Sequence, residues 1–462
     1  VFYNAGEGWG AAGRIAAELD RLCDIGKSFV EAGQWANAQV VYATVAEEAS
    51  VQYERLQDEG EISWILGQCA AGLVACLEAQ STLPRSERLD AADREELLIS
   101  LFDLWKFGYN YGGVVVDIPA SIAGYATAHE RKRVEVWLRQ ELRPRKDSSG
   151  TWHYRSIVDF VVALKQAEHC SDEEVLEEYR NAGLYKELTE KFLQLDRANE
   201  ALGVAQTNLI EPRDVIWFAE QLLKLGETWP EQALAFVKTR LNEVEPALQS
   251  KPQDYTRTFT VDTYRRWLSE KYLLYGKTQS ALDIELARFQ ANPDVTTYRS
   301  VRSAAQVAGQ PKDVWSGLRP QLLRTLEQKS HWGALVTIYL DEGAVGQALA
   351  ALAEMERAPR TSLYASGYHP EAAPSTYQAQ VAQAAEESYP DQAIRLYKSV
   401  VQRLIDGRGR ENYQQAAGYL SRIRRLYQKQ GQELEWHAYS TNLRNSNKSL
   451  RALKEELDKR GL

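Results

Sequence analysis

One spacing recurs along this chain and limits the folds that it can adopt. The first half of the spacing is a large apolar residue, an apolar residue three positions later, and an aromatic or large residue four positions after that. The second half is a turn residue four positions further on, a small residue five positions after the turn, and an apolar residue four positions after the small one. Two stretches keep these intervals: Leu22, Ile25, Phe29, Gly33, Ala38 and Tyr42, and Trp332, Leu335, Tyr339, Gly343, Ala348 and Leu352. Intervals of three and four share one helix face, and glycine accepts the left-handed conformation that ends a helix. The spacing predicts a helix, a tight turn and an antiparallel helix.

Further copies of this frame occur along the 462 residues, while alternating β-branched runs are nearly absent. A shorter copy consists of Leu268, Tyr272, Gly276 and Ala281, and degenerate copies turn at Asp196, Gly226, Gly309 and Gly431. The turns at 276, 309 and 343 lie 33 and 34 residues apart, although 50 residues separate Gly226 from Gly276. A hairpin of about 34 residues resembles the tetratricopeptide repeat. That resemblance implies an all-α, right-handed superhelical solenoid of antiparallel helix pairs with a concave binding face.

Two interruptions of the helical pattern divide the chain into three predicted blocks. Residues 143–150 contain Pro, Ser and Gly, and residues 358–375 contain Pro and Ser. We therefore expect an N-terminal helical-repeat block at 1–142, central tetratricopeptide-like repeats at 151–357, and C-terminal basic repeats with a capping helix at 376–462.

The most unusual passage of the first block is rich in aromatic residues and glycine and spans residues 107–119. We expect a loop between helices there. Such a loop either lines a pocket, with Tyr109, Tyr111 and Asp117 as its candidate residues, or forms a packed connection between hairpins. An enzymatic pocket would need Asp117 to be buried beside another titratable group.

Residue patterns typical of catalytic and metal sites are missing from the sequence. The six histidines include no pair four positions apart with a glutamate between them, as zinc proteases have. Gly26-Lys27-Ser28 and Gly276-Lys277-Thr278 resemble the end of a phosphate-binding loop, but Arg21 and Lys271 stand where its first glycine belongs. We therefore predict no catalytic residue, metal ligand or cofactor in this chain, and no enzymatic activity.

The four cysteines and the lengths of the apolar runs indicate the cellular compartment of the chain and whether it contacts a membrane. Cys69 and Cys76 are two helical turns apart on an apolar helix, which predicts buried core thiols. No two of the four cysteines form a C-x-x-C pair, and this favours a reducing, cytoplasmic setting. No window reaches the roughly 18 uninterrupted apolar residues of a membrane span, so we expect no membrane partner.

Charge is distributed unevenly along the chain. The net charge is −9, yet residues 398–462 contain 14 Lys and Arg against 7 Asp and Glu. Five basic residues of this region form the candidate stripe, namely Arg408, Arg410, Arg422, Arg425 and Lys429. The stripe could bind phosphate on a nucleic acid, or it could pair with acidic residues of this chain or of a neighbouring copy. The spacing leaves both interpretations open.

Residues 389–420, with Tyr389-Pro390-Asp391 at their start and Tyr413 near their end, carry a family resemblance, as do Trp436 and residues 450–457. They resemble the helical C-terminal region of bacterial SWIM zinc-finger proteins. That family is named for an upstream C-x-C-x(n)-C-x-H zinc site, which this sequence does not contain. The resemblance implies that zinc could be bound only by an upstream segment absent from this chain.

Taken together, these features favour a non-catalytic helical-repeat scaffold or adaptor that binds a protein or peptide. The alternative is a nucleic-acid-associated regulatory protein that uses the basic stripe. The sequence leaves the identity of the partner and the oligomeric state open.

Overall fold

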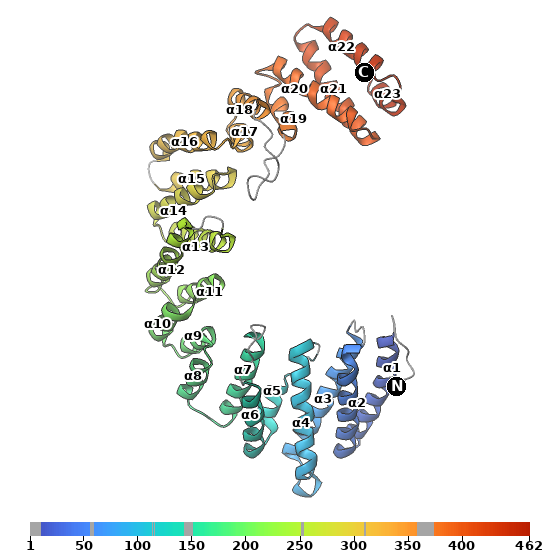
Figure 1. The fold of residues 1–462 in the computed structure, drawn as a ribbon, viewed down its shortest axis with the longest axis vertical. Coiled ribbons are helices and arrows are strands. Elements are labelled where there is room, and N and C mark those ends of the chain that lie inside the picture. Colours follow the sequence, from blue (N-terminus) through green and yellow to red (C-terminus); the bar gives the residue numbers. More distant parts are fainter. Residues whose placement is uncertain are drawn as a thin grey trace. The chain divides into compact units, whose positions relative to one another are not determined.

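A computed structural model describes residues 11–55, 60–112, 114, 116–142, 151–250, 254–308, 311–357 and 374–462. The regular elements in these ranges are α-helices and two short 3-10 helices, η2 (Tyr53–Arg55) and η3 (Arg85–Glu87), with no strand (Figure 1). The all-α prediction is confirmed. Contacts divide the chain into two compact units, Val1–Asp214 and Val215–Leu462.

The helices of the first unit follow one another closely along the chain. They are α1 (Ala11–Glu31), α2 (Trp35–Gln52), α3 (Glu61–Thr82), α4 (Ala91–Tyr111), α5 (Ile118–Tyr125), α6 (Ala128–Glu141), α7 (Thr151–Ala167), α8 (Asp172–Asn181), α9 (Tyr185–Gln194) and α10 (Ala198–Asn208). α11 (Pro212–Leu223) begins at the boundary between the units.

The second unit continues with the same alternation of helix and short turn. Its helices are α12 (Pro230–Ser250), α13 (Tyr255–Leu274), α14 (Thr278–Ala291), α15 (Val295–Val307), α16 (Pro311–Gln328), α17 (Trp332–Asp341), α18 (Val345–Arg357), α19 (Pro374–Ala385), α20 (Pro390–Asp406), α21 (Arg410–Lys429), α22 (Glu433–Ser446) and α23 (Arg451–Asp458). The predicted interruption at 143–150 lies outside the described residues. So does that at 358–375, apart from Pro374 and Ser375, with which α19 begins.

The predicted turn glycines end their helices in the left-handed conformation. Gly33, Gly276 and Gly343 have φ of 70°, and Gly431 has φ of 68°. In each turn the amide after the glycine donates to the carbonyl of the aromatic residue of the frame: Gln34 to Phe29 and Lys277 to Tyr272, both at 2.8 Å, Ala344 to Tyr339 at 2.8 Å, and Gln432 to Tyr427 at 2.9 Å. This bond satisfies a carbonyl that the end of a helix would leave unpaired. The predicted helix–turn–helix units are therefore confirmed at these four turns.

Other turns use the same geometry without glycine. Asp196, which we predicted as a glycine substitute, has φ of 56°, and Arg197 donates to the carbonyl of Phe192 at 2.9 Å. His169 and Ser330 also have positive φ, 58° each, and end α7 and α16. The repeating frame does not predict these two turns, because it requires glycine or aspartate at the turn position. Of the two remaining predicted turns, Gly226 has φ of 119° and lies between α11 and α12, and Gly309 lies outside the described residues.

The first copy of the frame has a different register from the one predicted. Leu22 and Ile25 are 37% and 46% exposed, and Cys23 is buried instead. The physical reason is the ring of Tyr42 on α2, which lies against Gly26 of α1 and Gly72 of α3. A Cβ atom on Gly26 would come within 2.8 Å of that ring, so α1 turns its glycine toward α2. The predicted core positions Leu22 and Ile25 are therefore wrong.

One described helix, α3, is long and apolar enough to cross a membrane by length and composition. Half of its apolar window is buried inside the structure. Ile65, Leu66 and Leu73 on it are completely buried in the core of the first unit. Packing within that core accounts for the composition of α3, and the absence of a membrane partner stays a prediction.

The expected loop at 107–119 is only partly a loop. α4 continues through Tyr111, so residues 107–111 form its last turns rather than a connection. Glycine at position 108 leaves room for the side chain of Val114, which packs against this part of the helix. A Cβ atom on residue 108 would lie 3.0 Å from the Cβ atom of Val114. The prediction mistook a close packing contact for a turn.

Candidate interaction surfaces

α13 has a buried face and an exposed face of very different composition. Tyr264 and Leu268 are fully buried. The opposite face carries residues at intervals of three and four, namely Tyr255, Phe259, Thr263, Arg266, Glu270 and Leu274, which we call the α13 stripe. Tyr255 is 61% exposed, Phe259 70% and Leu274 69%. Large apolar side chains this exposed on one helix face are typical of contact surfaces.

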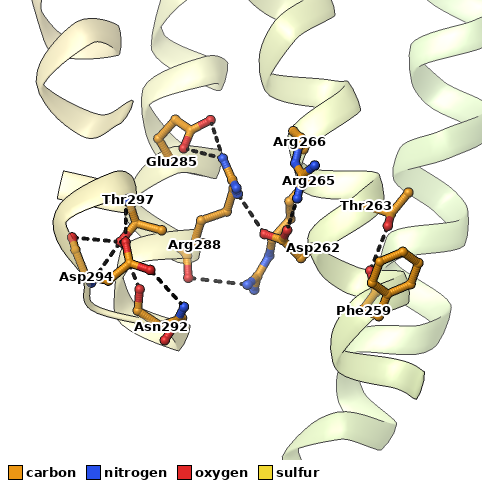
Figure 2. A network of polar contacts seen from close by, with 11 residues as sticks. Phe259, Asp262, Thr263, Arg265, Arg266, Glu285, Arg288, Asn292, Asp294 and Thr297 are labelled. Atoms are coloured by element: carbon orange, nitrogen blue, oxygen red, sulfur yellow. Dashed lines mark hydrogen bonds and ion pairs between the residues drawn. The ribbon is translucent and has the colours of Figure 1, made fainter. Parts of the chain in front are cut away.

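Ion pairs to α12 and α14 hold α13 in place beneath this stripe. Asp262 on α13 accepts from Nε of Arg288 on α14 at 2.9 Å and from Arg266 at 2.8 Å (Figure 2). Arg288 also pairs with the buried Glu285 at 2.9 Å, and Arg265 pairs with Glu245 of α12. Burial opposes ionisation of Asp262, but the hydrogen bonds from Arg288 and Arg266 outweigh it and keep its pKa below the usual value.

α11 supports α13 through a second set of contacts. The carboxylate of Glu220 on α11 accepts from Nζ of Lys271 at 2.8 Å and from Nε1 of Trp267 at 2.6 Å. Burial opposes ionisation of Glu220, yet these two donors lower its pKa. Thr263 bonds within α13, donating to the carbonyl of Phe259 at 2.8 Å (Figure 2). The exposed stripe therefore lies on a helix that is bonded to α11, α12 and α14.

The predicted basic stripe is split between two ends of one helix. Arg410 is the first residue of α21 and Lys429 the last, which separates them by about 28 Å at 1.5 Å per residue. Arg408 lies in the turn before α21, while Arg422 and Arg425 lie near Lys429 in its second half. The structure therefore brings together 408 with 410, and 422 with 425 and 429, but not all five.

Two of these five cations already have carboxylate partners. Arg410 pairs with Glu455 and lies 3.6 Å from Glu456, and Arg422 pairs with Glu386 at 2.8 Å. Burial raises the pKa of Glu386, but the hydrogen bonds from Tyr397 and Arg422 outweigh burial, and its pKa is lowered. Arg408, Arg425 and Lys429 are exposed. Intramolecular pairing, the second interpretation of the stripe, thus applies to Arg410 and Arg422.

The residues of the predicted loop pocket make packing and capping contacts. The hydroxyl of Tyr111 donates to Glu54 at 2.5 Å, and the ring of Tyr109 lies 5.3 Å from that of Trp105. Asp117 is exposed and caps α5, accepting from the amide of Ala120 at 3.0 Å. Exposure leaves Asp117 without the buried environment that an enzymatic role would need.

The cysteines predicted to be core thiols are buried. Cys69 and Cys76 are completely buried, and burial raises the pKa of Cys76 to about 12. Cys23 is also buried, with its Sγ atom 3.8 Å from that of Cys69. All four cysteines are free thiols. Within the described ranges, no three His, Cys, Asp or Glu side chains are grouped so that they could hold a metal ion.

Comparison with known proteins gives limited matches. No family model matches the chain. The uncharacterized protein YwqB of Bacillus subtilis strain 168 is 40% identical over 72 residues, which is 16% of this chain and 13% of that protein. The chain therefore matches only 13% of the length of this curated relative. The resemblance to SWIM zinc-finger proteins stays a prediction.

Two solved structures show distant likeness. The structure of Naa15/Naa10 bound to HypK-THB is 10% identical with a TM-score of 0.31, over 95% of this chain and 65% of that one. The TPR domain of P58(IPK) is 13% identical with a TM-score of 0.18, over 96% of this chain and 97% of that domain. The repeat architecture is evident from the helix pairs and turns of the chain itself.

Proposed function

We propose that this chain is a non-catalytic helical-repeat scaffold that binds a protein or peptide partner through the α13 stripe. The observation that carries the proposal is the exposure of Tyr255 and Phe259, 61% and 70%, one turn apart on a helix. Aromatic side chains are enriched among the residues that dominate binding energy at protein interfaces.

The contacts of α13 with its neighbouring helices support the same proposal. A helix that is already folded and packed loses little backbone conformational entropy when a partner binds, which lowers the free-energy cost of association. The ion pairs of Asp262, Arg288 and Glu220 hold α13 from both neighbouring sides. Helical repeats present surfaces of this kind to extended partners.

The nucleic-acid alternative has weaker support. A phosphate-binding stripe needs cations that are free to meet successive phosphates, and binding through them weakens steeply with salt. Carboxylates of the chain already neutralise Arg410 and Arg422. Arg425 and Lys429 lie near one end of α21 and Arg408 lies before the other end, so these three exposed cations form no continuous basic run along which a nucleic acid could bind.

The test is affinity capture from native lysate with and without nuclease. The baits are the wild-type chain, the double variant Tyr255→Ser/Phe259→Ser and the control Val40→Ser, which removes an apolar side chain that is 63% exposed on α2. We expect a nuclease-resistant protein that binds the wild type and Val40→Ser and is lost from the double variant.

Two results would contradict this proposal. Equal retention of the protein by all three baits would show that the α13 stripe is not its contact surface. Capture that disappears with nuclease and on changing Arg422, Arg425 and Lys429 to Gln would favour the nucleic-acid alternative.

A further inference from the structure

Residues of α20, α21 and α22 line an open groove of about 300 Å³. α20 contributes Asp391, Ile394, Arg395 and Lys398 to its lining, and Tyr427 and Glu435 come from α21 and α22. The volume is at the lower end of the range for small-molecule sites, which suits one side chain better than a large ligand. We call this the Lys398 groove.

Lys398 is the unusual member of the groove. Its ammonium donates to the hydroxyl of Tyr427 at 2.8 Å and lies 4.3 Å from the centroid of the Tyr439 ring. The side chain is half-buried, and in the described part of the chain no carboxylate pairs with it. An ammonium has three donors, so one tyrosine hydroxyl and the ring faces leave it able to accept an anionic partner.

The other charges of the groove indicate which anion fits. Arg395 adds a second cation, while Asp391 and Glu435 add two carboxylates, so the four charged side chains sum to zero. Among the described ion pairs none joins these cations to these carboxylates. A doubly charged phosphate, or a nucleic-acid strand with its several charges, would be repelled by Asp391 and Glu435 more strongly than a single carboxylate. A single carboxylate beside a hydrogen-bond donor matches both signs of charge.

The apolar residues of the lining further restrict the chemical class of ligand that fits the groove. Ile394 and Tyr427 are 5% and 8% exposed and border the groove with carbon atoms. The methylene groups of a glutamate side chain can pack on such a surface while its carboxylate reaches a cation. One oxygen of Asp391 already accepts from Nε2 of Gln430 at 2.7 Å. Backbone N–H groups of the same peptide, or a neighbouring lysine, would supply donors to Glu435 and to the other oxygen of Asp391.

We propose that the Lys398 groove binds a glutamate or aspartate side chain of a partner protein, with its carboxylate against Lys398 and Arg395. The proposal rests on the scaffold function but uses a surface separate from the α13 stripe. It therefore assigns to the partner an acidic residue in addition to the segment that would contact α13.

The test uses the full chain and a matched pair of short peptides, acetyl-Ala-Glu-Lys-amide and acetyl-Ala-Gln-Lys-amide. Binding is followed by saturation-transfer NMR at constant ionic strength, with inorganic phosphate as a third probe. We expect the Glu peptide to bind about ten-fold more tightly than the Gln peptide and more tightly than phosphate, since charge-assisted hydrogen bonds are the stronger ones.

Variants connect this binding to the groove. Lys398→Gln and Arg395→Gln should each weaken binding of the Glu peptide several-fold, and Lys429→Gln, an exposed cation on α21 outside the lining, should leave it unchanged. Arg395 is exposed, so its variant tests the groove even if Lys398→Gln lowers the melting temperature.

The proposal would be overturned by equal binding of the two peptides, by unchanged binding to both groove variants, or by tighter binding of phosphate. Its failure is distinguishable from that of the scaffold function. Loss of peptide selectivity with normal capture through the α13 stripe rejects the groove alone. Intact peptide selectivity with unaltered capture by the Tyr255→Ser/Phe259→Ser bait rejects the α13 stripe alone.

Discussion

Tyr42 occupies space that two glycines leave open. Gly26 on α1 and Gly72 on α3 face its ring from two helices, and this packing decides which face of α1 is buried. Burial raises the pKa of the Tyr42 hydroxyl to about 12. The frame placed Tyr42 correctly in a hairpin, but it could not reveal Gly72, because that contact comes from the next helix pair along the chain.

The Tyr42 contact predicts a large effect from one methyl group. In Gly72→Ala the new Cβ atom would lie 2.2 Å from the ring, and the ring cannot retreat because Gly26 is on its other side. We expect a loss of about 1–3 kcal/mol in the free energy of unfolding, measured by urea denaturation. Gly203→Ala on α10 is the control, since no atom lies within 4 Å of its Cβ position and alanine favours a helix. Equal effects of the two substitutions would refute this account.

At the scale of the helix, local sequence signals predict the termini well and the facing surfaces poorly. Ser171 and Glu174 form a capping box at the start of α8. Such a cap depends on residues three positions apart, which a sequence displays directly. The network of Asp262, Arg288 and Glu245 joins three helices and has no comparable signature in the sequence. The exposed α13 stripe and the Lys398 groove were missed for this reason.

The ion pairs of α13 predict a dependence of stability on pH. The pKa of Asp262 is below its usual value of 3.8, so the carboxylate stabilises the folded chain above that pH, and this contribution is lost as pH falls through the folded-state pKa. Asp262→Asn should cost about 1 kcal/mol or less at pH 7, because the site is partly exposed. The difference from wild type should shrink below about pH 3.8 in urea denaturation.

Asp283→Asn, on the exposed face of α14, serves as the control for this pH dependence. Its effect on the free energy of unfolding should be small at every pH, because among the described residues its carboxylate bonds only to Gln279 on the same helix. A gap between Asp262→Asn and wild type that stays constant down to pH 3 would show that Asp262 acts through its shape rather than its charge.

For the whole molecule, the sequence predicts the class of fold because each helix pair has the same packing requirement. Two helices must come close, and a small residue makes this possible: Ala38, Ala201, Ala281 and Ala348 are all completely buried. A surface that binds a partner has no packing requirement that recurs along the chain, so no repeated spacing marks it. The basic stripe was inferred from spacing along the chain, and the carboxylates that pair with Arg410 and Arg422 lie 45 and 36 residues away from them.

The repeat architecture also predicts which helices are destabilised when one helix pair is disrupted. Ala348→Trp should wedge α17 and α18 apart and lower the free energy of unfolding by a few kcal/mol. In a repeat array each pair contacts chiefly its neighbours, so hydrogen exchange should accelerate in α15–α20 and stay unchanged in α1–α6. Ala291→Trp, at an exposed position of α14, is the control and should leave exchange near wild-type rates. Acceleration throughout the chain would argue against a modular array.

The left-handed turns at His169, Asp196 and Ser330 have a consequence for how helix pairs are counted from a sequence. The geometry of each turn is maintained by backbone hydrogen bonds, as between His331 and the carbonyl of Leu326 at 2.9 Å, and not by the identity of one residue. The same turn can therefore form at Asp, His or Ser as well as at glycine. A count of helix pairs that relies on glycine alone would be too low for this chain.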